Sequence, residues 1–401
     1  MWEQKKRLLI ALTLIITVVF ALGAGAILTS TPTQNQIAKG ANLVWEKTFG
    51  GTGDDRAFYA ASVGDGYVVV GSSTSFEQGK TVACVVRFDH DGNQLWNHTY
   101  SENVGAEFRY VRSLQDGFLL VGNTFLASGK IDGYIMKLDI QGNPIWNATL
   151  KASEGINKLF SGVTDGSNLI VTGLTQPQTN STNSQAWILK LDSNGNVLWN
   201  KTFGDSVESA ARAVTLTQDN CYMVAGYVDS SGDGNYDFLA LKLDANGNLL
   251  WGKTYGGLQS DKAYTITSSA NSCVIAGDTR SKGSGDCDAW IIKIDLNRNM
   301  LWDQTSGGTN FDSPTFITVS PDGGYLVAGT TFSFGNGERD FWLFKVSDAG
   351  KILWSCTVGR SGYEEAYAVL YAGGNDYVLA GWTNSIGSGG RYDFYVVKVR
   401  V

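Results

Sequence analysis

The sequence predicts an all-β fold, namely a seven-bladed β-propeller of four-stranded blades that is closed by its N-terminal strand and follows an N-terminal transmembrane or signal helix. One segment recurs seven times at steps of 50 to 53 residues, and a fixed period near this length is typical of propeller blades. Glycine (49 of 401 residues) far exceeds proline (5), which fits many tight turns between strands. Each copy is centred on a tryptophan: Trp45, Trp96, Trp146, Trp199, Trp251, Trp302 and Trp354.

The chain is expected to have three parts, a signal anchor or signal peptide at 1–29, a polar tether at 30–40 and the propeller at 41–401. Residues 8–28 carry no charge, and as a helix of about 30 Å they are long enough to span a bilayer core. Basic residues at 5–7 predict a cytoplasmic N-terminus and a propeller outside the cytoplasm. The alternative is a cleaved signal peptide, because Ala24-Gly25-Ala26 resembles a cleavage site. We therefore expect a single-pass protein of the cell membrane, or a secreted one if the segment is cleaved.

Each unit of the repeat contains four predicted strands. The tryptophan strand comes first and is followed by a glycine-rich loop such as Gly50-Gly51. The next strand follows an acidic residue, and the one after it is nearly all apolar, as in Phe118 to Val121. An unbroken apolar strand is expected to be buried on both faces, as when sheets stack on each other. The last strand ends on a basic residue in every unit: Arg87, Lys137, Lys190, Lys242, Lys293, Lys345 and Lys398.

A tight turn of the type Asp-x-x-Gly-Asn leads into each following tryptophan strand, as at 192–196. Glycine provides the positive φ that such a turn requires. Arg298 replaces this glycine in one unit, so we expect that turn to be strained.

The order of strands at the two ends predicts how the ring closes. The repeat region opens with a tryptophan strand at 42–49 that has no unit before it, and it ends on a last strand that has no tryptophan strand after it. We expect the strand at 42–49 to become the outer strand of the last blade, which would hide the edges of an open array.

The repeated Leu-Asp-x-x-Gly-x-x-x-Trp pattern resembles the tryptophan-docking motif of quinoprotein-like (PQQ-type) propellers and the repeat propellers of prokaryotic surface proteins. The resemblance covers 41–401 and implies the radial fold. The pattern differs from the quinoprotein motif because the aspartate lies one residue closer to its glycine, Ser347 replaces it once, and seven units stand where eight are typical. Redox chemistry is not implied, because there is no adjacent cysteine pair.

Composition excludes several functions. The formal net charge is −7 and the basic residues are scattered, which argues against nucleic-acid binding because phosphate contacts need clustered positive charge. Five cysteines without CxxC spacing argue against structural zinc and a disulfide framework. The two histidines, His90 and His98, have no candidate nucleophile nearby in the pattern, so a histidine-based hydrolase has little support.

Recurrent acidic residues are the main candidate site. Asp55, Asp261, Asp312 and Glu364 open the second strand of their units, and a ring of acids around one mouth would attract cations or a basic partner. The alternative is that each accepts hydrogen bonds from its own loop. In one loop, Asp233, Asn235 and Asp237 have the alternating oxygen ligands of a calcium site, although Phe238 stands where such a loop has glycine. No other cofactor is predicted.

Surface modification and aromatic contacts provide further candidates. N-x-Thr sequons begin at Asn97, Asn147, Asn180 and Asn200, which suit glycosylation of an exported protein. The repeat tryptophans are expected to pack between blades, with a sugar-binding surface as the alternative. Trp382 and Tyr392 are the better candidates for an exposed aromatic contact.

Function is expected to be binding or scaffolding at the cell surface, with an unidentified protein or glycan as partner. The alternative is an extracellular enzyme acting on carbohydrate or another substrate, a hydrolase or lyase with loop carboxylates as acid and base. The near-identity of the units favours binding, because catalysis needs different groups at one place. The most divergent units, at 101–184, are where a specific site is expected first.

Overall fold

The computed structural model describes residues 40–102, 104–166, 168–177, 183–204, 208–229, 231–387 and 391–401, all of which belong to one compact unit, Ile37–Val401. These residues form 28 strands and no helix, which confirms the all-β prediction. Within these ranges there is accordingly no helical segment suited to crossing a bilayer. The predicted signal anchor and all but the last residue of the predicted tether lie outside the described residues.

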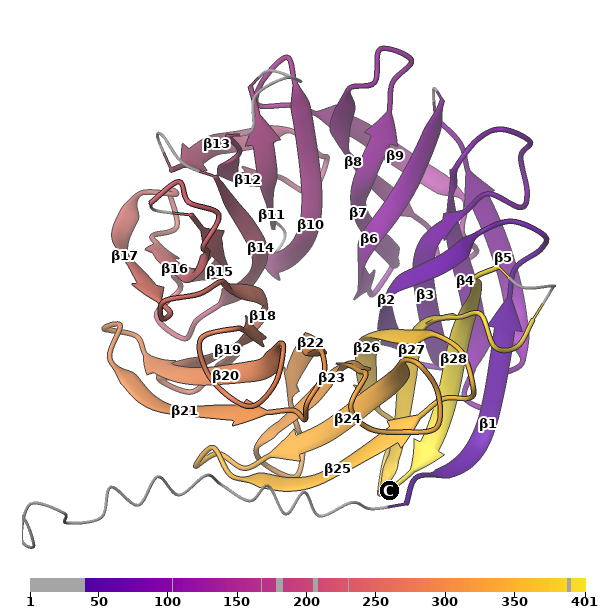
Figure 1. Ribbon diagram of the computed structural model, residues 1–401. Helices are drawn as coiled ribbons and strands as arrows, with labels where there is room; N and C mark the ends of the chain where they lie inside the picture. The colour runs from indigo at the N-terminus through magenta and orange to yellow at the C-terminus, as the bar shows by residue number, and fades with distance from the viewer. Residues whose placement is uncertain are drawn as a thin grey trace, which may run out of the picture. The chain divides into compact units, whose positions relative to one another are not determined.

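The strands group into seven antiparallel sheets of four (Figure 1), which we number along the chain. Sheets 2 and 3 are joined by one parallel bridge, between Ile131 and Ile156. Sheet 1 contains β2 (Asp55–Val63), β3 (Gly66–Ser73), β4 (Val82–Asp89) and β5 (Gln94–Tyr100). Sheet 2 contains β6 (Gly105–Leu114), β7 (Gly117–Phe125), β8 (Ile131–Leu138) and β9 (Pro144–Leu150). Sheet 3 contains β10 (Ile156–Asp165), β11 (Asn168–Gln176), β12 (Gln185–Leu191) and β13 (Val197–Phe203).

The remaining sheets repeat this order. Sheet 4 contains β14 (Ser209–Leu216), β15 (Tyr222–Val228), β16 (Asp237–Leu243) and β17 (Leu249–Tyr255). Sheet 5 contains β18 (Asp261–Ser269), β19 (Ser272–Thr279), β20 (Asp288–Asp295) and β21 (Met300–Ser306). Sheet 6 contains β22 (Asp312–Val319), β23 (Tyr325–Thr331), β24 (Asp340–Val346) and β25 (Ile352–Val358). Sheet 7 contains β26 (Glu364–Tyr371), β27 (Asp376–Thr383) and β28 (Asp393–Arg400), with β1 (Asn42–Phe49) as its fourth strand.

The second strand of each sheet lies in the core. Every residue of β3 is buried, and so is every residue of β19 and β23. Because side chains alternate between the two faces of a strand, such a strand needs a neighbour on each face. The buried clusters meet this need, since each combines apolar residues of two adjacent sheets.

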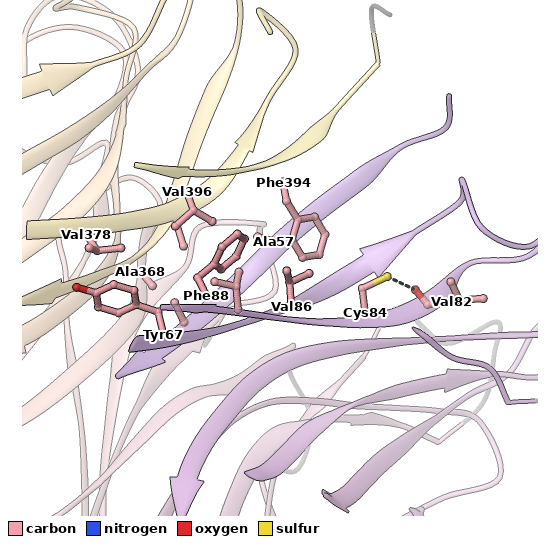
Figure 2. Packing of buried hydrophobic residues seen from close by; sticks show 13 residues of the cluster. Ala57, Tyr67, Val82, Cys84, Val86, Phe88, Ala368, Val378, Phe394 and Val396 are labelled. Atoms are coloured by element: carbon pink, nitrogen blue, oxygen red, sulfur yellow. Dashed lines mark hydrogen bonds between the residues drawn. The ribbon is translucent and has the colours of Figure 1, made fainter. Parts of the chain in front are cut away.

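Sheets 1 and 7 pack on each other in the same way as neighbours in sequence. Figure 2 shows Tyr67, Val86 and Phe88 of sheet 1 against Val378 and Val396 of sheet 7, all in one buried cluster. Neighbouring sheets are also joined by a backbone hydrogen bond. Its donor is the first residue of a sheet's first strand, which we call the inner strand (β2, β6, β10, β14, β18, β22 and β26), and its acceptor is the residue before the third strand of the preceding sheet. The bond from Asp312 N to Cys287 O has a length of 2.8 Å, and its equivalent between sheets 7 and 1 runs from Asp55 N to Tyr392 O at 2.6 Å.

Strand β1 is the outer strand of sheet 7, although about 300 residues of chain separate it from the other three strands. It pairs antiparallel with β28 from Asn42 opposite Arg400 to Phe49 opposite Phe394. Glu46 adds side-chain contacts, because it forms an ion pair with Arg360 and accepts a 2.8 Å hydrogen bond from the Tyr395 hydroxyl.

The repeat tryptophans lie between sheets. In four of them the indole N–H donates to a carbonyl in the turn of the next sheet. The bonds run from Trp45 to His90 (3.3 Å), Trp199 to Ala245 (3.2 Å), Trp251 to Leu296 (3.1 Å) and Trp302 to Asp348 (2.9 Å). A Cβ on the turn residue Gly247 would lie 3.0 Å from the Trp199 ring, so the close approach needs glycine there as well as a positive φ.

Arg298 adopts the glycine conformation of this turn with φ of 69°. A residue with a Cβ is rarely found in this region and is strained by about 1 kcal/mol or more. Its carbonyl accepts hydrogen bonds from Lys253 Nζ at 3.2 Å and Tyr255 at 2.9 Å, so its backbone contacts do not depend on the arginine side chain.

Deletion of residues 41–49 is expected to abolish cooperative unfolding. It exposes the edge of β28 and removes Trp45 from the buried cluster that sheets 1 and 7 share. Differential scanning calorimetry measures this. The exposed Leu43 lies on the same strand, so Leu43→Ser is the matched control and should melt like the wild type. A deletion variant with a sharp, native-like transition would contradict the role of β1.

Replacing Arg298 with glycine is expected to stabilise the chain by about 1 kcal/mol, since glycine adopts positive φ without a Cβ penalty. Denaturant unfolding measures the change. The converse substitution, Gly247→Arg, should destabilise by more than this amount because it adds a collision with Trp199. Equal stability of Arg298→Gly and wild type would mean that this turn is not strained.

Candidate functional site

The inner strand of every sheet has a β-bulge at the same position. The register skips one residue there, for example between Ala57 and Tyr59 opposite β3. A bulge leaves the extra residue unpaired and turns its side chain away from the regular alternation, which is why bulges are common beside functional sites. The seven bulged residues, which we call the axial ring, are Phe58, Arg109, Phe160, Arg212, Tyr264, Thr315 and Tyr367.

All seven residues of the axial ring line one pocket of about 280 Å³. Each sheet therefore contributes its inner strand to a shared central space, and Figure 1 shows these strands nearest the middle of the unit. Other lining residues include Tyr59, Tyr110, Arg112 and the hydroxyl side chains of Ser161 and Thr215. The lining contains three arginines and no aspartate, glutamate, histidine or cysteine, although the whole chain carries a net charge of −7.

Arg109 is neutralised by its own strand. It donates two hydrogen bonds of 2.8 Å to the carboxylate of Glu107, and its guanidinium lies 3.8 Å from the centre of the Phe58 ring. This fork-to-fork contact fixes the arginine plane and uses both carboxylate oxygens. Arg109 therefore supplies shape and hydrogen-bond donors to the pocket, with little uncompensated charge.

Arg212 differs because it has no acidic partner. Among the described residues it forms no ion pair, and its Nε is enclosed without a hydrogen-bond acceptor. Its guanidinium lies 4.1 Å from the centre of the Phe160 ring and 5.7 Å from that of Tyr264. Burial lowers the pKa of Arg212, and the nearby Arg109 adds to this effect.

Three tyrosines of the pocket, Tyr59, Tyr110 and Tyr264, stay protonated. Burial raises the pKa of Tyr110 to about 12, and it raises the pKa values of Tyr59 and Tyr264 as well. Their hydroxyls are therefore hydrogen-bond donors at physiological pH. Tyr59 and Tyr110 have ring centres 4.7 Å apart, so together they form one aromatic wall.

The acidic residues at the start of the inner strands are found in a different place, at the junctions between sheets. Asp55, Asp261, Asp312 and Glu364 are all fully buried, so their side chains form no exposed acidic face. Each accepts hydrogen bonds from its own loop, as the alternative interpretation of the sequence expects. Asp312, for example, accepts from Gly308 N at 2.7 Å and Ser333 Oγ at 2.6 Å.

Each of these carboxyls faces a second one from the preceding sheet. A Cβ on Gly307 would collide with Oδ1 of Asp288 and lie 3.0 Å from Oδ2 of Asp312, so the two oxygens lie on either side of this glycine. Burial raises the pKa of Asp288 to about 6, and the negative charge of Asp312 contributes. The equivalent pairs are Asp237 with Asp261, Asp340 with Glu364 and Asp393 with Asp55.

One junction carries an amide in place of the second acid. Between sheets 2 and 3, Asn157 Nδ2 donates a 3.0 Å hydrogen bond to Asp132 Oδ1. This junction therefore has a hydrogen bond between the two side chains. The equivalent junction with Asp288 and Asp312 has two carboxyl groups that repel each other when both are ionised. In contrast, Asp288 Oδ1 is buried without a hydrogen-bond partner.

The residues of the predicted calcium loop do not converge. Asp233 accepts hydrogen bonds within its own loop, from Ser231 Oγ at 2.7 Å and Asn235 N at 2.9 Å, whereas Asp237 lies at the junction beside Asp261. Throughout the part of the chain that the structure describes, no group of three or more acidic, histidine or cysteine residues is arranged to hold a metal ion.

Three predicted glycosylation sites are exposed on outer strands. Asn97, Asn147 and Asn200 are solvent-exposed on β5, β9 and β13, and Asn180 lies outside the described residues. The Asn200 side chain also accepts a 2.7 Å hydrogen bond from the indole of Trp187, which a glycan on its nitrogen would leave in place because the oxygen is the acceptor.

The predicted exposed aromatic pair is largely enclosed. Trp382 is only 5% exposed, because it packs on Tyr392 with ring centres 4.4 Å apart and Arg56 lies over both rings. The prediction that Trp382 is exposed is therefore wrong, and the cause is the arginine from the neighbouring sheet.

Sequence reasoning did not identify the axial ring. Its members are three residues after the position of the recurrent acid, in a column where the aligned repeats differ in chemistry: Phe, Arg, Phe, Arg, Tyr, Thr and Tyr. A search for recurring residues overlooks such a column because nothing in it recurs. The prediction that a specific site would lie in the divergent units 101–184 located two members of the ring, Arg109 and Phe160.

Comparison with known proteins identifies the fold. No family model matches the chain. A periplasmic gluconolactonase of Pseudomonas aeruginosa superposes with a TM-score of 0.52 at 15% identity, covering 83% of this chain and 96% of that one. Sqt1 from Chaetomium thermophilum gives a TM-score of 0.45 at 12% identity over 88% and 86% of the two chains.

In sequence, the chain is 25% identical over 232 residues to the regulatory protein FlaEY of Caulobacter vibrioides, covering 51% of this chain and 24% of that protein. The chain thus spans about a quarter of the length of this relative. Together with the sheets described above, the gluconolactonase comparison shows that the chain has a β-propeller fold.

The buried carboxyl pairs predict how stability depends on pH. A carboxyl whose pKa is raised by folding stabilises the folded chain below its unfolded pKa, and this contribution is lost as pH rises through the folded value, here about 6 for Asp288. We expect Asp288→Asn to be more stable than wild type at pH 7.5 by roughly 1 to 3 kcal/mol. The advantage should shrink as the pH falls from 6 to 4.

Thermal unfolding of both proteins between pH 4 and 8 measures this effect. The matched control is Asp132→Asn, since Asp132 faces an amide and not a second acid. It should gain no stability at pH 7.5. Parallel pH profiles for Asp288→Asn and wild type would contradict the raised pKa.

Proposed function

We propose that the chain is an exported binding module, a closed seven-bladed propeller that takes a small ligand in its axial pocket. The observation that carries this proposal is the axial ring, in which seven equivalent bulges present seven side chains of different chemistry to one space. A ring of different side chains around one space suits recognition of an asymmetric ligand.

The site offers contacts for binding. Among the residues that the structure describes, the pocket lining contains no carboxylate or imidazole, and the recurrent acids of the inner strands are buried at the sheet junctions. General acid and base groups must reach the reacting atoms. These facts favour binding over the alternative of a hydrolase or lyase with loop carboxylates.

Closure of the ring is part of the proposal. It is supported by the pairing of β1 with β28 and by the cluster shared between sheets 1 and 7. The tryptophans beneath the turns support membership in the quinoprotein-like group of propellers. The uncharged run at 8–28 supports export, with the chain kept at the cell surface or secreted if that run is cleaved. Partners at the surface, and glycans on the exposed sequons, belong to the same proposal.

Filling the pocket is expected to abolish ligand binding without unfolding the chain. Thr315 belongs to the axial ring and is partly exposed, so Thr315→Trp places a large ring in the open space. We expect compounds from a metabolite library that raise the melting temperature of the wild type to have no effect on this variant. Thr202→Trp, on an outer strand, is the control and should respond like the wild type. A library without one compound that stabilises the wild type would contradict the proposed function.

A further inference from the structure

Arg212 carries a partly buried positive charge, and no acidic side chain of the described residues forms an ion pair with it. Removing a guanidinium from water costs on the order of several kcal/mol unless a counter-charge or hydrogen-bond acceptors replace the solvent. The aromatic rings of Phe160 and Tyr264 supply part of this, since cation–π contacts contribute about 0.5 to 2 kcal/mol. They do not satisfy the enclosed Nε–H, which has no acceptor.

We propose that the axial pocket binds the carboxylate or phosphate group of a small molecule, with the guanidinium of Arg212 as its main contact. The inference rests on the proposed binding function and adds the chemical class of the ligand. An oxyanion in the pocket would accept hydrogen bonds from the guanidinium, because arginine presents a planar fork of donors that matches both groups.

The acidic residues nearest this region are already in use. A hollow that adjoins the pocket shares Arg212, Tyr264, Thr315 and Tyr367 with it and adds Asp278 and Glu365. Asp278 accepts a 2.9 Å hydrogen bond from the Tyr264 hydroxyl, and burial raises its pKa. Glu365 forms an ion pair with Arg339 and accepts a 2.9 Å hydrogen bond from Tyr367.

Neither of these acids forms an ion pair with Arg212, and both are fixed by partners of their own. The charge of Arg212 is therefore directed to the pocket. Arg112, which is exposed and lines the same pocket, adds a second positive charge that attracts an anion over a longer range.

The remaining lining suits a ligand with a flat or apolar part. Four of the seven ring residues are aromatic, and Tyr59 and Phe316 pack edge to face beside them with centres 5.5 Å apart. Thr265 adds a hydroxyl group that can donate to a ligand oxygen, whereas the hydroxyls of Thr215 and Thr315 donate to Ser268 and Ala366. An aromatic carboxylate therefore matches the pocket better than an isolated inorganic ion, and a phosphate ester with an apolar part matches it equally.

Benzoate and benzamide are suitable probes because they share a ring and differ in charge. Isothermal titration of the full-length protein is expected to show benzoate binding at least tenfold more tightly than benzamide. Phenyl phosphate separates the two oxyanions, and tight binding of either one supports the proposal. Equal affinities for benzoate, phenyl phosphate and benzamide would overturn it.

Three arginine variants test whether Arg212 is the residue that contacts the oxyanion. Arg212→Met should reduce benzoate affinity at least tenfold, to the level of benzamide, whereas Arg212→Lys keeps the charge and should retain part of the preference. Arg298→Met, in an exposed turn on an outer hairpin, should bind benzoate like the wild type. An unchanged benzoate affinity in Arg212→Met would overturn the inference.

A second readout keeps the test independent of folding. Nitrogen NMR of the arginine Nε–H groups in the wild type should show one signal that is absent from Arg212→Lys and shifts when benzoate is added. If benzamide binds in the axial pocket and Thr315→Trp abolishes this, but benzoate has no advantage, the binding function stands and the oxyanion assignment fails. If no probe binds and the signal does not move, the oxyanion assignment fails, and the library screen decides the function separately.

Discussion

Burial of the middle strands on both faces is the constraint from which the rest of the structure follows. A strand such as β3 or β19, with every residue buried, cannot be covered by its own sheet. It needs one sheet on each side, and a set of identical sheets meets this need when each packs on two neighbours. The first and last sheets also pack on each other, in the cluster that contains Phe88 and Val396. The turn glycines that pack on the repeat tryptophans set the distance between neighbouring sheets.

This packing decides where the candidate site lies. Radial stacking brings the seven inner strands together, and the bulge in each one directs a single side chain to the shared space. Packing constrains the residues that lie between sheets, so they repeat. It places little constraint on a bulged residue, which has neither a ladder partner nor a sheet against it. The axial ring can therefore differ from sheet to sheet without cost to the fold, and Arg212 has no equivalent with the same surroundings.

The recurrent acids illustrate the opposite case, because they repeat for a structural reason. They organise the loops at the sheet junctions by accepting hydrogen bonds from backbone amides and hydroxyls, as Asp261 does from Gly257 N and Ser281 Oγ, both at 2.8 Å. The facing carboxyl makes each pair electrostatically unfavourable when both are ionised, and the Asn157 substitution relieves this at one junction. The recurrent acids therefore serve the fold, whereas the candidate site consists of residues that differ from sheet to sheet.

The sequence alone determined the class of fold, the period, the four strands of each unit and the turn in which Arg298 is strained, because these depend on local hydrophobic pattern and on residues that permit positive φ. It also determined which strands are buried on both faces. Only the tertiary structure decided that Asp55 and Asp312 are buried, that Trp382 is covered by Arg56, and that Arg109 has a carboxylate partner while Arg212 has none among the described residues. The burial of the acids and the cover over Trp382 arise between sheets, and the pair of Arg109 with Glu107 forms across a bulge that the local pattern does not reveal. No local pattern in the sequence specifies which side chains from different units meet at the axis.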